Sequence, residues 1–117
     1  MAFEITTRHL DCVIVVDAVG RLTLNDSRTQ LRDLIHIFTS NGHKNFLLNL
    51  AGVDFIDSDG MGELVRSYSV VRQKGGEMKL VHLHERVHHL LQITRVNGIF
   101  EIYDEEQLAL QAFRKRA

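Results

Sequence analysis

The sequence predicts an α/β fold, in which a mixed β-sheet with an initial antiparallel hairpin is covered by about four helices. Three observations support this class. Short apolar or alternating runs typical of strands are followed by stretches whose apolar residues recur at helical spacing. The connections are short, and no linker, repeat or low-complexity tract interrupts the chain. With 117 residues, 44% of them hydrophobic, the chain has the size of one domain over residues 1–117, with a single core.

The first half of the chain supplies a hairpin, a helix and a buried strand. The run FEITTRHLDCVIVVDAVG predicts two strands, with Leu10 and Asp11 at the turn between them. In LNDSRTQLRDLIHIFTSNG the apolar residues recur at helical spacing, and Asn25, Asp26 or Ser27 is available as the N-cap. The stretch KNFLLNLAGVDFI then predicts a buried strand followed by a short extended link.

The second half alternates two strands with three helices. A helix is predicted from Gly60 to Gln73, because an apolar stripe precedes Gly75 and Gly76. EMKLVHL predicts a strand, ERVHHLLQITR a helix and IFEIYD a short strand. The last stretch, DEEQLALQAFRKR, begins with acids and ends with bases, which suits the dipole of a closing helix.

Composition argues against several classes of function. The formal net charge is -1 and the basic residues are scattered, so neither a nucleic acid nor an anionic membrane surface is an expected partner. Cys12 is the single cysteine and stands in an apolar run, which predicts a buried thiol in a reducing compartment. No apolar segment is long enough to cross a bilayer, and the first residues do not resemble a signal peptide. We therefore expect a cytoplasmic protein.

The stretch VDFIDSDGMGELV places a serine between two acids where a strand gives way to a helix. Asp57, Ser58 or Asp59 could simply cap that helix, since a side-chain oxygen there accepts an orphan backbone N–H. A serine at a helix start, followed by glycines that permit close approach of a partner, is also well placed to accept a phosphate. A nucleophilic role is less favoured, because the sequence is not a G-x-S-x-G elbow and no acid–histidine pair is evident.

A long stretch of the chain combines an apolar strand, an acid-Ser turn followed by Gly-apolar-Gly, a helix and a Gly-Gly entry into the next strand. These features lie in LLNLAGVDFIDSDGMGELVRSYSVVRQKGGEMKLVHLHERVHHLLQITRVNGIFEIYDEEQLAL. With this combination, nearly the whole chain resembles the STAS domains of bacterial anti-sigma factor antagonists. The combination is specific, although no single part of it is. The expected fold is therefore the STAS fold.

The resemblance implies a binding module that is switched by phosphorylation and catalyses nothing. Ser58 occupies the position that a serine kinase of the histidine-kinase-like ATPase superfamily phosphorylates in that family, and the same kinase acts as the anti-sigma factor. The unphosphorylated antagonist binds this kinase and frees the sigma factor, and a PP2C-type phosphatase restores that state. ATP and magnesium belong to the kinase, so no cofactor is expected here. The implied partner surface comprises Asp57, Ser58, Asp59, Gly60, Met61 and Gly62, with Arg21 and Thr23.

Two positions differ from the usual family pattern. Arg21 and Thr23 stand where members often carry acids, which changes the charge of the expected docking face. Asp59 follows the serine where Ser or Thr is common, and its fixed charge is expected to tune phosphorylation. The alternative function is a structural or ligand-sensing STAS module in a signalling scaffold or a lipid-transport complex, in which the serine loop only caps a helix.

Four histidines stand close together in HLHERVHH. His82 and His84 have strand spacing, whereas His88 and His89 are adjacent on the next predicted helix. Adjacent helical residues point about 100° apart, so both cannot readily face one ion. No cysteine or carboxylate stands with them at a recognised ligand spacing. We therefore predict no metal site.

Overall fold

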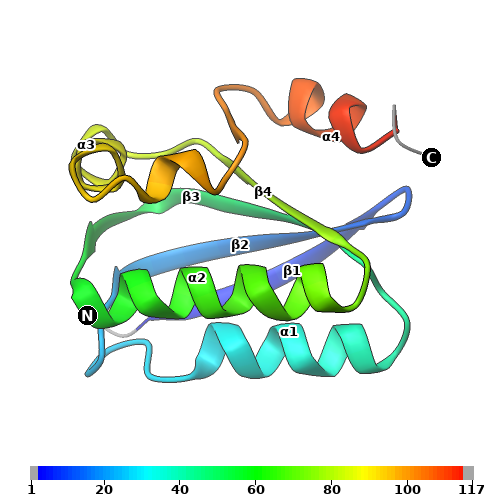
Figure 1. Ribbon diagram of the computed structural model, residues 1–117, viewed down its shortest axis with the longest axis horizontal. Helices are drawn as coiled ribbons and strands as arrows, with labels where there is room; N and C mark the ends of the chain where they lie inside the picture. Colours follow the sequence, from blue (N-terminus) through cyan, green and yellow to red (C-terminus); the bar gives the residue numbers. More distant parts are fainter. Residues whose placement is uncertain (1–2, 115–117) are drawn as a thin grey trace.

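The computed structural model describes residues 3–114, and its five strands form one mixed sheet covered by four helices (Figure 1). This confirms the predicted fold class. The strands are β1 (Glu4–Leu10), β2 (Val13–Leu22), β3 (Asn45–Ile56), β4 (Glu77–Val81) and β5 (Ile102–Tyr103). The helices are α1 (Gln30–Ser40), α2 (Ser58–Gln73), α3 (Glu85–Ile93) and α4 (Glu106–Arg114), with the 3₁₀ turn η1 (Val96–Gly98) after α3. None of the described helices is long and apolar enough to span a membrane.

The strands lie in the sheet in chain order, β1-β2-β3-β4-β5. The β1–β2 pair is antiparallel and the other three pairs are parallel. Leu10 pairs with Val13, so the hairpin turn is formed by Asp11 and Cys12, one residue later than predicted. The prediction of a buried thiol is therefore wrong, because Cys12 lies in this tight turn and is exposed.

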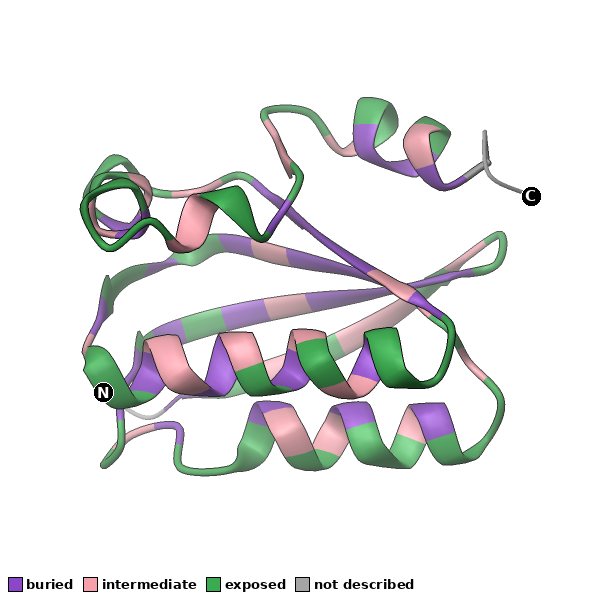
Figure 2. Ribbon diagram, in the orientation of Figure 1, coloured by how far each residue is buried: buried purple, intermediate pink, exposed green. Residues whose placement is uncertain are grey.

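The central strands of the sheet are buried on both faces because helices pack on each side of it, whereas the edge strand β1 is not buried (Figure 1, Figure 2). Along β2, Ile14 and Val16 face α1 and α2, whereas Val13 and Val15 face α4. Side chains that alternate along a strand point to opposite faces, which explains the continuous β-branched run at the start of β2. The smaller core on the α4 side is completed by Leu47, Val81, Ala109, Leu110 and Phe113.

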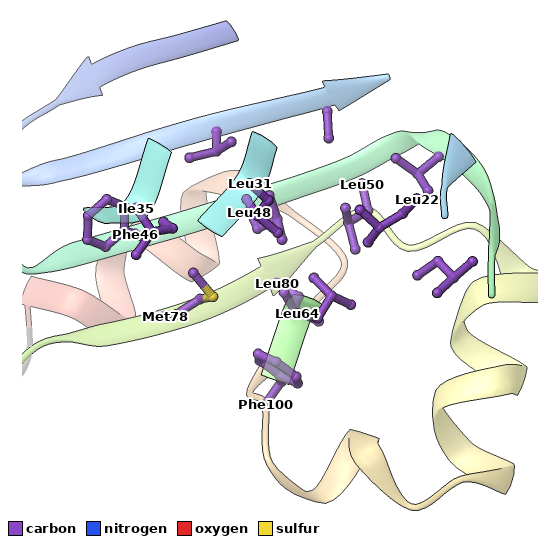
Figure 3. Packing of buried hydrophobic residues seen from close by; sticks show 14 of the residues in the cluster. Leu22, Leu31, Ile35, Phe46, Leu48, Leu50, Leu64, Met78, Leu80 and Phe100 are labelled. Atoms are coloured by element: carbon purple, nitrogen blue, oxygen red, sulfur yellow. The ribbon is translucent and has the colours of Figure 1, made fainter. Parts of the chain in front are cut away.

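The larger core lies between the sheet and α1 and α2, and 14 of its residues are drawn in Figure 3. Leu31 and Ile35 of α1 and Leu64 of α2 are at most 1% exposed. They pack on strand residues that include Phe46, Leu48, Leu50 and Leu80. Burial on this scale contributes about 1.5–3 kcal/mol for each large apolar side chain. α1 and α2 are thereby fixed on the sheet, and with them the loops that precede them.

Several boundaries differ from the sequence prediction. α1 begins at Gln30, so the predicted caps Asn25, Asp26 and Ser27 lie in the turns before the helix. Strand β4 ends at Val81, before His82, and β5 is only two residues long. α4 is described from Glu106 to Arg114, and the last residues of the predicted closing helix lie outside the described part of the chain.

Candidate functional site

Asp57 caps α2 and ties the start of this helix to the loop after β2. Its backbone is extended, with φ -98° and ψ -178°, and its Oδ1 accepts a hydrogen bond of 2.7 Å from Gly60 N. Its Oδ2 accepts a longer bond, 3.4 Å, from Leu24 N, and its own N–H donates to the carbonyl of Leu22 at 3.3 Å. The cap that sequence reasoning left open among three residues is therefore Asp57. The helix begins two residues earlier than predicted.

Because Asp57 provides the cap, the Ser58 hydroxyl has no structural role that the geometry shows. Ser58 is the first residue of α2 and is exposed, and its side chain makes no hydrogen bond with any residue between 3 and 114. Asp59 is the next residue and is also exposed. The first N–H groups of a helix lack intrahelical acceptors and carry the positive end of its dipole. The serine hydroxyl is therefore accessible and lies where negative charge is favoured.

The two glycines after the serine have different surroundings. Gly60 is buried, and a Cβ there would lie 1.8 Å from the carbonyl oxygen of Leu22. Gly60 therefore allows α2 to pack on the backbone of β2. Gly62 is partly exposed, and a Cβ there would lie 3.1 Å from the guanidinium nitrogens of Arg66. Gly62 thus leaves room for Arg66 to lie back along the helix.

Met61 is partly exposed and links the start of α2 to the end of α3. Its sulfur accepts a hydrogen bond of 3.3 Å from the hydroxyl of Thr94. Its side chain also packs on the edge of the larger core. Of the predicted surface residues, Met61 is therefore the one that connects the serine loop with the neighbouring helix.

Of the two early residues in the predicted partner surface, only Arg21 is exposed. Arg21 lies over the ring of Phe55 at 4.6 Å, and its Nε is 3.8 Å from Asp26 Oδ2. Thr23 is 5% exposed, and its hydroxyl donates to Asp26 Oδ2 at 2.8 Å and accepts from Asp26 N at 3.0 Å. Its carbonyl accepts the hydroxyl of Ser27. Thr23 is therefore buried, and its hydrogen bonds stabilise the loop before α1.

The structure also brings together charged residues that sequence reasoning did not single out. Arg28, Arg32 and Arg66 line a groove of about 540 Å³ together with Asp59 and Glu63. The groove runs from the loop before α1 to the first turns of α2. The one signal visible in the sequence was the three-residue spacing of Glu63 and Arg66, which is common on solvated helices. Arg32 lies close to Glu63 only because α1 packs on α2.

The histidines do not come together as a ligand set. His82 follows the end of β4 with a positive φ of 57°, so it does not share a strand face with His84. His84 is the N-cap of α3, and its Nδ1 accepts a hydrogen bond of 3.3 Å from Arg86 N. Within residues 3–114, no three His, Cys, Asp or Glu side chains are grouped so that they could hold a metal ion.

The mixed-sheet α/β fold is the one that the sequence resemblance predicted, and in it Ser58 directly follows the acid that caps α2. The family model described as "STAS domain" matches residues 4–109. The chain therefore belongs to the STAS domain family. The anti-sigma F factor antagonist of Paenibacillus polymyxa is 30% identical over 110 residues, which cover 94% of each chain.

Two solved structures share the fold over almost the whole chain. An anti-sigma factor antagonist from Mycobacterium paratuberculosis matches with a TM-score of 0.83 and 20% identity, over 97% of this chain and 95% of the other. The Bacillus cell fate determinant SpoIIAA in its phosphorylated form matches with a TM-score of 0.68 and 18% identity, over 95% and 99%. At these identities the two structures support the fold of the chain.

Proposed function

We propose that the protein is a cytoplasmic anti-sigma factor antagonist whose binding to an anti-sigma factor is switched by phosphorylation of Ser58. The observation that carries this proposal is the division of roles at the start of α2. Asp57 makes the capping hydrogen bond, and the Ser58 hydroxyl remains exposed and unbonded within the described residues. In a chain of the STAS family, this leaves the serine available to a kinase without loss of the helix cap.

A phosphate on Ser58 would change the charge of this surface by about -1.5 to -2. The dipole of α2 would favour the added charge, whereas the neighbouring carboxylate of Asp59 would oppose it. The altered surface would no longer accept a partner that fits the unmodified serine. The fold would tolerate the change because Ser58 is exposed and packs against nothing in the core.

The partner in this proposal is an anti-sigma factor that is also a serine kinase of the histidine-kinase-like ATPase superfamily. It binds the unphosphorylated protein, releases the sigma factor, and phosphorylates Ser58 with its own ATP and magnesium. A PP2C-type phosphatase reverses the modification. The protein itself acts as a regulator and not as an enzyme, in agreement with the relatives, whose names describe antagonists of anti-sigma factors.

Affinity capture from the native cell tests the switch. Wild type, Ser58→Ala and Ser58→Asp serve as baits, and Ser69→Asp is the matched control because Ser69 is an exposed serine further along α2. Mass spectrometry should identify a histidine-kinase-like ATPase on every bait except Ser58→Asp. Capture of transporter or scaffold proteins that is insensitive to Ser58→Asp would instead support the alternative function.

Phosphorylation is then tested with the purified captured kinase and ATP. Wild type and Ser69→Ala should each gain one phosphate, whereas Ser58→Ala should gain none. Intact mass gives the stoichiometry, and circular dichroism verifies that the variants are folded. Labelling of Ser58→Ala to the level of wild type would show that the proposed phosphosite is wrong.

A further inference from the structure

The groove beside the first turn of α2 carries more positive than negative charge. Three arginines and two acids line it, which leaves one positive charge in excess. Arg28 and Asp59 are exposed, and neither side chain makes a hydrogen bond or ion pair with another residue between 3 and 114. Arg28 lies in the loop before α1, where its φ is 48°. Because the guanidinium of Arg28 has no ion-pair partner among the described residues, its positive charge is not compensated there.

Glu63 positions two of the arginines without neutralising both. Its side chain is 7% exposed, and its Oε1 lies 3.1 Å from Arg66 Nη2 and 3.8 Å from Arg32 Nε. Its Oε2 is buried and has no hydrogen-bond partner among the described residues. A single carboxylate oxygen thus faces two guanidinium groups. Most of the N–H donors of these two groups remain available for another acceptor.

Two of the arginine side chains, Arg32 on α1 and Arg66 on α2, are positioned by the carboxylate of Glu63. Arg66 lies back over Gly62, where even one methyl group would come within 3.1 Å of its guanidinium nitrogens. The anchoring carboxylate of Glu63 is on the next residue and is itself buried. Preorganised guanidinium groups bind carboxylates through paired N–H donors at a lower entropic cost than free ones. The groove is therefore built to receive oxyanions.

We propose that this groove receives acidic side chains of the protein that docks over Ser58, an inference that rests on the proposed function. The side chains of Arg32 and Arg66 are 34% and 53% exposed, so the groove is open and does not enclose a small ion. Asp59 lines the groove and directly follows Ser58, so a protein that covers the serine also covers the arginines. Covering them removes water and strengthens each ion pair. Carboxylates of a protein partner complement the excess positive charge.

The groove itself is tested with a hexaglutamate peptide, with no need for the natural partner. In NMR titrations at low ionic strength, the peptide should shift the guanidinium N–H signals of Arg28, Arg32 and Arg66. The double variant Arg28→Gln/Arg66→Gln should weaken peptide binding about fivefold or more, whereas Asp59→Asn should strengthen it. The control is Lys74→Gln, which removes an exposed cation at the opposite end of α2. It should leave the affinity unchanged.

Two results with the peptide would overturn the proposal. Equal weakening by Lys74→Gln and by the single variant Arg66→Gln, each of which removes one positive charge, would show that only net charge matters. Binding of inorganic phosphate as tightly as the peptide would show a small-ion site. Circular dichroism and thermal melts verify that the variants are folded, so that a loss of binding is not a loss of structure.

The proposal is tested a second time by measuring how tightly the captured kinase binds the variants. The double arginine variant should weaken its binding about fivefold or more, and the difference should shrink at high salt. A kinase that is sensitive to Ser58→Asp but not to the arginine variants would overturn the groove and leave the proposed switch intact. Sensitivity to the arginines without sensitivity to Ser58→Asp would leave the groove intact and overturn the switch.

Discussion

Two clusters of arginine and carboxylate lie in different parts of this molecule, and they are paired in opposite ways. Arg8 donates to both oxygens of Asp17, at 2.6 and 2.9 Å, and to Glu106 at 2.6 Å. Asn49 donates to Asp17 as well, at 2.8 Å, so the cluster joins β1, β2, β3 and α4. In the groove beside Ser58, by contrast, two arginines share one oxygen of Glu63 and Arg28 has no described partner.

This difference separates charge that stabilises the fold from charge that remains available to a partner. In the first cluster, hydrogen bonds from Arg8 lower the pKa of Asp17, and the bonds that Arg8 donates to Asp17 and Glu106 raise the pKa of Arg8. Mutual bonds of this kind favour the charged forms and hold α4 to the sheet. In the groove, most of the guanidinium N–H donors of Arg32 and Arg66 have no acceptor among the described residues. Removing an arginine should therefore affect stability in the first cluster and binding in the second.

The largest expected effect concerns the contact at Gly60, where the first turn of α2 packs on the backbone of β2. Gly60→Ala would place a Cβ 1.8 Å from the carbonyl oxygen of Leu22, and backbone atoms cannot easily move away. We expect a loss of about 3 kcal/mol in the free energy of unfolding. Gly98→Ala is the control, because its Cβ would meet nothing within 4 Å. Chemical denaturation measures both, and similar values for the two variants would show that the start of α2 is loosely held.

The second prediction compares the two clusters directly. Arg8→Gln should lower the free energy of unfolding by about 1–2 kcal/mol, because two carboxylates lose a charged partner. Arg66→Gln should change it by about 0.5 kcal/mol or less, because Arg66 is half exposed and shares its acceptor with Arg32. Urea denaturation at neutral pH gives both values. Equal losses would mean that the groove arginines are structural, and the distinction between the clusters would fail.

The fold and the position of the serine were predictable because both depend on local patterns. Helical and strand periodicity indicated the α/β class, and the Asp57–Ser58 pair marked the boundary between β3 and α2. The start of α1 was not predictable in the same way. Ser27 and Asp26 resemble caps, but the structure uses both to close a turn around Thr23 before the helix begins. Local propensity could not distinguish these two uses of the same side chains.

Tertiary pairing was the part that sequence patterns could not supply. Lys79 falls within an alternating strand pattern, but it is 1% exposed on the α4 side of the sheet. Its Nζ lies 3.1 Å from Glu77 and 3.0 Å from Glu101, and 5.1 Å from the centre of the Phe113 ring. The groove is a similar case, since Arg32 and Arg66 come from different helices. Partners that are distant in sequence are fixed by packing, which local periodicity does not encode.

The third prediction separates the cap from the proposed switch at the start of α2. Asp57→Ala should lower the free energy of unfolding by about 1 kcal/mol, because it removes the acceptor of the Gly60 N–H. Ser58→Ala should change it by about 0.5 kcal/mol or less, because the serine hydroxyl makes no described bond. Urea denaturation of wild type and both variants at the same pH and temperature measures these changes in the free energy of unfolding. A larger loss in Ser58→Ala would identify the serine as a structural residue and weaken the case for a switch.

The smallest expected effect is the dependence of the first cluster on acid. The pKa of Asp17 is lowered in the folded protein, chiefly by hydrogen bonds from Arg8, so its contribution is fully present above its unfolded value of about 3.9. That contribution is lost as the pH falls through the lower, folded pKa. The difference in unfolding free energy between wild type and Asp17→Asn should therefore narrow as the pH falls below about 4, the unfolded value. In an Arg8→Gln background the narrowing should be smaller, because the main cause of the shift is gone. A difference that stays constant with pH in both backgrounds would show that pairing with Arg8 does not favour the charged form of Asp17 in the folded protein.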